Sequence, residues 1–203
     1  MDLNQIYPLI VPRSYYSEGS WELPHQQFYN KQFLLTWVFF TGSGVMSYIT
    51  KEQFVVLNEN HSGWQQTSFE NLRHSITDKE NFFTHHATGS DGKTIIFLAF
   101  VHGDGIGSSR ILLSNELSNI FPNGYQVALP DRSVGIVVPN GINLQEMKEV
   151  KQMTNDMYKK ATTPMSGQVY NSEWFSLPEK WLMPVDKDFA SALINQSRET
   201  IGK

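Results

Sequence analysis

The chain has 203 residues, of which 40% are hydrophobic, so it is long enough to bury a core without disulfides or metals. Its 16 basic and 20 acidic residues give a formal net charge of −4, and no basic cluster exceeds the pair Lys159–Lys160, so we expect no nucleic-acid partner. The absence of cysteine excludes disulfides, thiolate catalysis and cysteine-ligated zinc.

The N-terminal sequence predicts a cytoplasmic protein. It begins with an acidic Asp2 and a short apolar run interrupted by Pro8, whereas a signal peptide has a basic start and a longer apolar stretch. The longest apolar segment, Phe33–Phe40, is too short to span a bilayer. We therefore expect a soluble protein that has no membrane partner.

Residues 1–30 carry three prolines and no clear hydrophobic period, which predicts an irregular or edge-strand arm that lies on the core. Aromatic residues are concentrated in this arm and in the strand that follows it. If part of it is exposed, four of them are candidate partner-binding residues, because their types anchor protein interfaces: Trp21, Phe28, Tyr29 and Trp37. Alternatively, these rings complete the hydrophobic core, as large apolar side chains usually do.

Two strands and two helices are predicted next. The apolar runs on either side of Thr41–Gly44 favour a hairpin. Thr50 is followed three residues later by a glutamine, the spacing of a capping box, so a helix is expected to begin at Lys51. Ser62 repeats this signal, and the second helix is expected to end near Ser75.

The middle of the chain predicts two further hairpins. Runs of strand-forming residues flank Gly89–Lys93, where an Asp-Gly pair tolerates positive φ. Thr94–Val101 is apolar at nearly every position, as in a central strand buried on both faces. A helix is expected over Ser109–Ile120, and the next hairpin is expected to turn at Asp131–Ser133.

The last third of the chain predicts two helices. Asn143–Tyr158 has apolar residues near one face and charges on the other, and residues 186–198 form a terminal helix with Phe189, Leu193 and Ile194 directed inward. Strands and helices thus come in groups rather than in strict alternation. The sequence therefore predicts an α+β fold, mainly an antiparallel sheet built from hairpins with helices packed on it.

Five short motifs suggest a family. In chain order they are "SYITKEQF", "SFENLRHS", "IGSSRILL", "VALPDRS" and "TPMSGQVY". Together they resemble the YtpQ-like bacterial proteins, a domain-of-unknown-function family with no established activity. The family's arginine-containing turn ends in an acidic residue where this chain has Ser133, so no role for a carboxylate transfers to that position.

The resemblance covers about Val45 to Tyr170 and implies three parts in the chain. Residues 1–44 would be the aromatic arm with the first hairpin strand, and residues 45–170 a YtpQ-like α+β core. Residues 171–203 would be a C-terminal extension that ends in a helix.

The stretch "HGDGIGSSR" is a candidate anion site. Spaced glycines and a helix start would offer an anion free N–H groups and the positive end of the helix dipole, and two arginines would add bidentate donors. The candidate ligand-binding residues are Gly105, Gly107, Ser108, Ser109, Arg110 and Arg132. The spacing matches neither a dinucleotide fingerprint nor a P-loop. Alternatively, the stretch is a capped helix start whose arginines pair with internal acids or carbonyls.

Metal and covalent catalysis find little support. His102 and Asp104 could supply two metal ligands, with a third from His85 or His86, which alternation sends to opposite faces of a strand. The sequence contains no HExxH helix and no GxSxG elbow. We therefore expect no metal and no cofactor, and we favour a binding protein over an enzyme.

Two functions remain open. In the first, the chain is a non-enzymatic protein-binding or adaptor module that contacts a protein partner, or a second copy of itself, through the aromatic arm or a sheet edge. In the second, it binds or acts on a small anionic ligand at Gly105–Arg110 together with Arg132.

Overall fold

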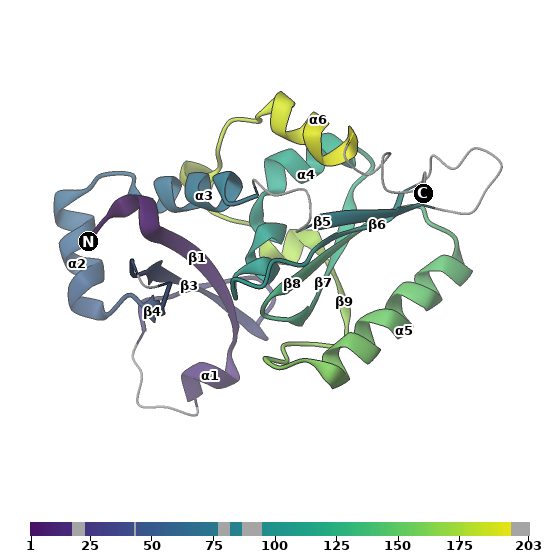
Figure 1. Cartoon of the computed structure of the whole chain (residues 1–203), viewed down its shortest axis with the longest axis horizontal. Helices are drawn as coiled ribbons and strands as arrows, with labels where there is room; N and C mark the ends of the chain where they lie inside the picture. The colour runs from purple at the N-terminus through teal and green to yellow at the C-terminus, as the bar shows by residue number, and fades with distance from the viewer. Residues whose placement is uncertain (18–22, 43, 77–81, 87–94, 196–203) are drawn as a thin grey trace. The chain divides into compact units, whose positions relative to one another are not determined.

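The computed structural model describes five stretches of the chain: residues 1–17, 23–42, 44–76, 82–86 and 95–195. The chain divides into two compact units, Met1–Ile76 with Glu173–Met183 and Thr77–Ser172 with Pro184–Lys203. Each unit has its own antiparallel sheet and its own helices (Figure 1). The predicted α+β fold, with antiparallel sheets and packed helices, is confirmed.

The sheet of the first unit is centred on β3 (Phe33–Phe40). β1 (Ile6–Pro12) pairs antiparallel along the length of β3, whereas β2 (Gln26–Gln27) pairs near its start and β4 (Met46–Tyr48) near its end. The β3–β4 pairing confirms the first predicted hairpin. β1 is an edge strand that carries prolines, as predicted, but most of its side chains are buried, so it belongs to the core.

The helices of the first unit begin with η1 (Leu3–Gln5) and α1 (Ser14–Ser17). α2 (Lys51–Asn60) starts at the predicted residue with both hydrogen bonds of the Thr50 capping box. α3 (Trp64–His74) ends where expected and packs against β1 (Figure 1). The Ser62 signal was wrong, because Gly63 occupies the N-cap in the left-handed region, with φ of 78°, and provides no side-chain cap.

A segment from late in the chain completes the core of this unit. It contains the end of η3 (Ser172–Phe175) and η4 (Glu179–Trp181). The ring of Phe175 lies 5.3 Å from that of Phe28, and the ring of Trp181 lies 5.6 Å from that of Trp37. The compact units therefore differ from the predicted division at residues 44 and 170, because side chains distant in sequence pack together.

The second unit contains a five-stranded antiparallel sheet in the order β5-β6-β8-β7-β9. Its strands are β5 (Phe82–His86), β6 (Ile95–Phe100), β7 (Tyr125–Asp131), β8 (Val134–Pro139) and β9 (Val169–Asn171). The β5–β6 and β7–β8 hairpins and the buried, central position of β6 are confirmed. The predicted turn at Gly89–Lys93 lies outside the described residues.

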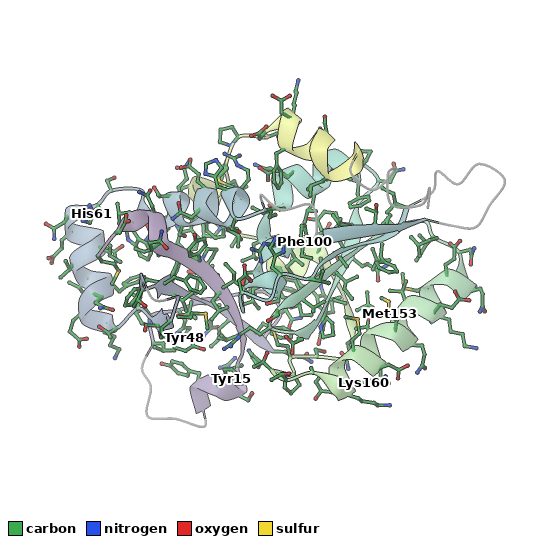
Figure 2. All side chains as sticks on the ribbon, viewed as in Figure 1. Tyr15, Tyr48, His61, Phe100, Met153 and Lys160 are labelled. Carbon is green, nitrogen blue, oxygen red and sulfur yellow. The ribbon has the colours of Figure 1, made fainter. Side chains whose placement is uncertain are left out.

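Helices lie on both sides of this sheet (Figure 1). α5 (Leu144–Lys160), capped by Asn143, packs Val150 and Met153 onto the sheet, and Figure 2 labels Met153 on this helix. α4 (Ser114–Ile120) contacts the terminal helix α6 (Lys187–Asn195), in which Leu193 is buried as predicted.

The helix predicted over Ser109–Ile120 requires a correction. The structure has a 3₁₀ helix, η2 (Gly107–Leu112), then a break at Leu113, and only then α4. Within the part of the chain that the structure describes, no helix has both the length and the hydrophobicity needed to cross a bilayer.

Candidate functional site

The predicted anion-binding helix start is a packed junction between η2 and the β7–β8 turn. The Ser108 N–H donates to the Arg132 carbonyl and the Ser109 N–H to the Ile106 carbonyl, both over 3.0 Å. Both serines are buried, and neither side chain caps the helix. These two N–H groups therefore have internal acceptors, which corrects the prediction that they are free for an anion.

The glycines of this stretch serve close backbone packing. A Cβ atom on Gly107 would lie 1.9 Å from the Ser133 carbonyl oxygen, so only glycine fits there. Gly105 has a φ of 78°, a left-handed conformation that L side chains rarely adopt. A turn therefore explains Gly105 and a close backbone contact explains Gly107, so neither glycine needs a ligand to account for its position.

Arg110 is fully buried and forms a two-bond ion pair with Asp104. Its Nη2 lies 2.6 Å from Asp104 Oδ2 and its Nη1 lies 3.2 Å from Asp104 Oδ1, which also accepts the Ile106 N–H. Burial raises the pKa of Asp104, but the hydrogen bonds and charge of Arg110, with smaller contributions from Ile106 and His102, outweigh it and lower that pKa. Arg110 therefore follows the alternative interpretation, an arginine paired with an internal acid.

Arg132 lies near the loop that contains Asp104 and Gly105, but its side chain is not paired with a carboxylate among the described residues. Its guanidinium lies close to Gly105, where a Cβ atom would lie 3.6 Å from both Nε and Nη2. The Nε atom is buried and has no hydrogen-bond acceptor among the described residues. The structure thus brings both predicted arginines to one loop, but it pairs only one of them with a carboxylate.

The histidines form no metal centre within the described residues, where no group of three histidine, aspartate or glutamate side chains could hold an ion. His102 is buried, and its electrostatic interaction with Asp104 contributes to the lowered pKa of that carboxyl. The side chains of His85 and His86 lie outside the described residues, so their prediction as possible third ligands stays a prediction.

Two of the four predicted partner-binding aromatics belong to the core. Phe28 and Trp37 are buried, and Trp37 packs edge-on against both Trp64 and Trp181. Their prediction as surface anchors is corrected, because the hydrophobic core of the first unit takes up both rings. Trp21 lies outside the described residues. Tyr29, in contrast, has 81% of its surface exposed.

A second exposed aromatic residue, Trp174, lies on a segment bonded to the one that carries Tyr29, and the sequence did not predict it. Trp174 is 40% exposed, and its carbonyl accepts the Asn30 N–H over 3.1 Å, which joins its backbone to the segment that carries Tyr29. We call Tyr29 and Trp174 the aromatic pair. Each is next in sequence to a buried phenylalanine, Phe28 or Phe175. Two adjacent aromatic residues in an irregular segment, one of them buried, are the sequence signal from which the aromatic pair could have been predicted.

The first unit also has an open cleft of about 820 Å³ beside the β3–β4 turn. Its lining includes Met1, Asp2, Phe39, Phe40 and Gln53. The carboxylate of Asp2 already accepts the Asn4 N–H, and the cleft contains none of the predicted site residues. The lining brings together no set of groups suited to acid–base or nucleophilic chemistry within the described residues.

Comparisons with known proteins add no assignment to this geometry. No family model matches the chain, and no curated protein and no solved structure is significantly similar to it.

Proposed function

We propose that the chain is a non-enzymatic protein-binding module that contacts its partner through the aromatic pair, Tyr29 and Trp174. The observation that carries this proposal is the exposure of two large aromatic side chains on neighbouring, hydrogen-bonded segments of one unit. Tyrosine and tryptophan are among the residues that contribute most to protein–protein binding when they are buried at an interface.

The backbone that carries the aromatic pair is anchored by buried side chains and by a backbone hydrogen bond. Phe28 and Phe175 are buried, and their rings lie 5.3 Å apart, while the Asn30 N–H donates to the Trp174 carbonyl. A partner would therefore meet aromatic side chains on an ordered backbone, which lowers the entropic cost of binding. The neighbouring Lys31 and Glu173 are exposed and supply the polar rim typical of an interface.

The five sequence motifs support placing this module in the YtpQ-like family of bacterial proteins. The alternative of a small anionic ligand at Gly105–Arg110 has weaker support, because the Ser108 and Ser109 N–H groups and the Arg110 side chain already have internal partners. Arg132 is the part of that predicted site whose buried Nε has no acceptor among the described residues.

The test is affinity capture from a bacterial lysate followed by measurement with the purified partner. The baits are the wild type, Tyr29→Ala/Trp174→Ala and a control, Tyr15→Ala/Tyr158→Ala, which removes two tyrosines that are each 38% exposed. A protein partner should bind the wild type and the control, and the aromatic-pair variant should bind it about thirtyfold more weakly, as expected for the loss of an interface anchor worth about 2 kcal/mol.

Either of two outcomes would contradict the proposal. In one, no protein is retained in stoichiometric amount by the wild type. In the other, a protein is retained equally by the wild type and by the aromatic-pair variant, which would place the interface elsewhere on the chain.

A further inference from the structure

The Arg132 side chain carries a charge that the described residues do not compensate. The residue is only partly exposed, and its Nε is buried without an acceptor. A buried N–H without an acceptor is costly, whereas the terminal nitrogens of this partly exposed residue are not among the buried atoms that lack a partner. The Arg132 guanidinium can therefore bind an anion through those terminal nitrogens.

The two carboxylates nearest to Arg132 along this loop and turn are occupied by other donors. Asp104 accepts two hydrogen bonds from Arg110 and one from the Ile106 N–H. Asp131, the preceding residue, accepts the N–H of Ser133 over 2.7 Å and both the N–H and the hydroxyl of Thr163. Neither is therefore available to neutralise Arg132 without breaking bonds that hold the loop and the turn together.

The backbone of Arg132 is fixed on both sides. Its N–H donates to the Thr163 carbonyl over 3.1 Å, and its carbonyl accepts the Ser108 N–H over 3.0 Å. The guanidinium lies close to Gly105, so the loop borders the side chain on one side. The Ser108 hydroxyl, on the residue whose N–H donates to the Arg132 carbonyl, is also buried without a partner among the described residues. An arginine positioned in advance loses less entropy when it binds an anion.

We propose that Arg132 anchors a binding site for the oxyanion of a small ligand, a phosphate or a carboxylate group. The buried Nε leaves the two terminal nitrogens as the side of approach, and their N–H groups present a planar fork to two oxygens of one anion. Arg110 contributes no bond to the ligand, because its guanidinium is buried and held by Asp104. The site is therefore smaller than the one predicted from the sequence, and it depends on one arginine.

Nuclear magnetic resonance on the ¹⁵N-labelled full chain tests the proposal. One titration uses inorganic phosphate and a second uses acetate, each at constant ionic strength maintained with sodium chloride. The Gly105 amide and the Arg132 Nε–H should shift and saturate with phosphate, with acetate or with both, and the arm that saturates identifies the anion. Arg132→Gln should abolish the saturable shift, and Arg132→Lys should weaken binding about tenfold through loss of the planar fork.

Lys159→Gln is the matched control, since it removes an exposed cation from α5 in the same unit and should leave the titration unchanged. A linear response, an equal response to added chloride, or an unchanged response in Arg132→Gln would overturn the proposal. If Arg132→Gln does not fold, Arg132→Lys and the wild-type Nε–H resonance still decide the outcome. Because the aromatic pair plays no part in this test, its result is independent of the protein-capture experiment.

Discussion

Arg110 in η2 and Arg132 in the β7–β8 turn show how two identical side chains near one loop acquire different roles. Arg110 has Asp104 six residues before it, and the 3₁₀ turn between them brings the carboxylate into two-bond contact. Arg132 has an acidic neighbour too, but the carboxylate of Asp131 turns back to the Ser133 N–H and to Thr163. Removing the carboxylate of Asp104, which is 32% exposed, is costly because the charge of Arg110 stays buried.

The Asp104–Arg110 pair should make the stability of the protein depend on pH. The pKa of Asp104 is lowered in the folded state from its ordinary value of 3.8, so the unfolded chain takes up the proton first as the pH falls. The stabilisation from this carboxylate is therefore complete at pH values above the unfolded-state pKa of 3.8. It is lost as the pH falls through the lower, folded-state pKa. Urea unfolding of the wild type and of Asp104→Asn at a series of pH values measures it.

Asp104→Asn should lower the free energy of unfolding at neutral pH by about 1–3 kcal/mol, the usual cost of a lost charged hydrogen bond. Its stability should also fall less steeply in acid than that of the wild type. Glu59→Gln, which neutralises an exposed carboxylate on α2, serves as the control. Equal acid dependence in the wild type and in Asp104→Asn would show that the pair does not couple folding to pH.

At the scale of single elements, the sequence predicted those helix boundaries that are set by residues close to them in sequence. Thr50 gives the start of α2 because both hydrogen bonds of its capping box lie within four residues. The same rule failed at Ser62, where Gly63 in the left-handed region takes the N-cap. The helix predicted to begin at Ser109 was also wrong, because a 3₁₀ helix stands there, and its Gly107 contacts Ser133 in a turn 26 residues further on. A contact of that range leaves no local sequence signal.

Gly107→Ala tests this contact between elements. The new Cβ atom would lie 1.9 Å from the Ser133 carbonyl oxygen. That oxygen belongs to the backbone, and the backbone of residue 107 fixes the position of the Cβ atom, so η2 or the β7–β8 turn must move. We expect a loss of more than about 2 kcal/mol in the free energy of unfolding, measured by urea denaturation. Gly103→Ala is the matched control, because nothing lies within 4 Å of its Cβ position, and it should change stability by less than about 0.5 kcal/mol. Equal stability of the two variants would contradict this account.

At the scale of the whole molecule, the two units are not continuous in sequence. The first unit contains Met1–Ile76 and the later segment Glu173–Met183, and the residues between and after these segments belong to the second unit. The sequence predicted the α+β class and most of the hairpins, but it did not predict that Glu173–Met183 belongs to the first unit. The reason is physical: Phe175 and Trp181 look like any aromatic residues in an irregular stretch, and their partners Phe28, Phe33, Trp37 and Phe69 lie more than a hundred residues earlier. For the same reason the sequence did not predict that Trp174 lies on a segment bonded to Asn30, which is more than a hundred residues earlier.

Trp181→Ala should therefore weaken the first unit before the second. The indole is buried and packs 5.6 Å from the ring of Trp37, and its removal leaves a cavity that should cost about 3–5 kcal/mol. Hydrogen exchange read by mass spectrometry should show faster exchange in β1 and β3, with much smaller changes in β7 and β8. Trp174→Ala, an exposed tryptophan of the same segment, should leave both sheets protected. Equal loss of protection in both sheets would mean that the two units unfold as one, and that Glu173–Met183 stabilises the whole chain rather than the unit whose core it completes.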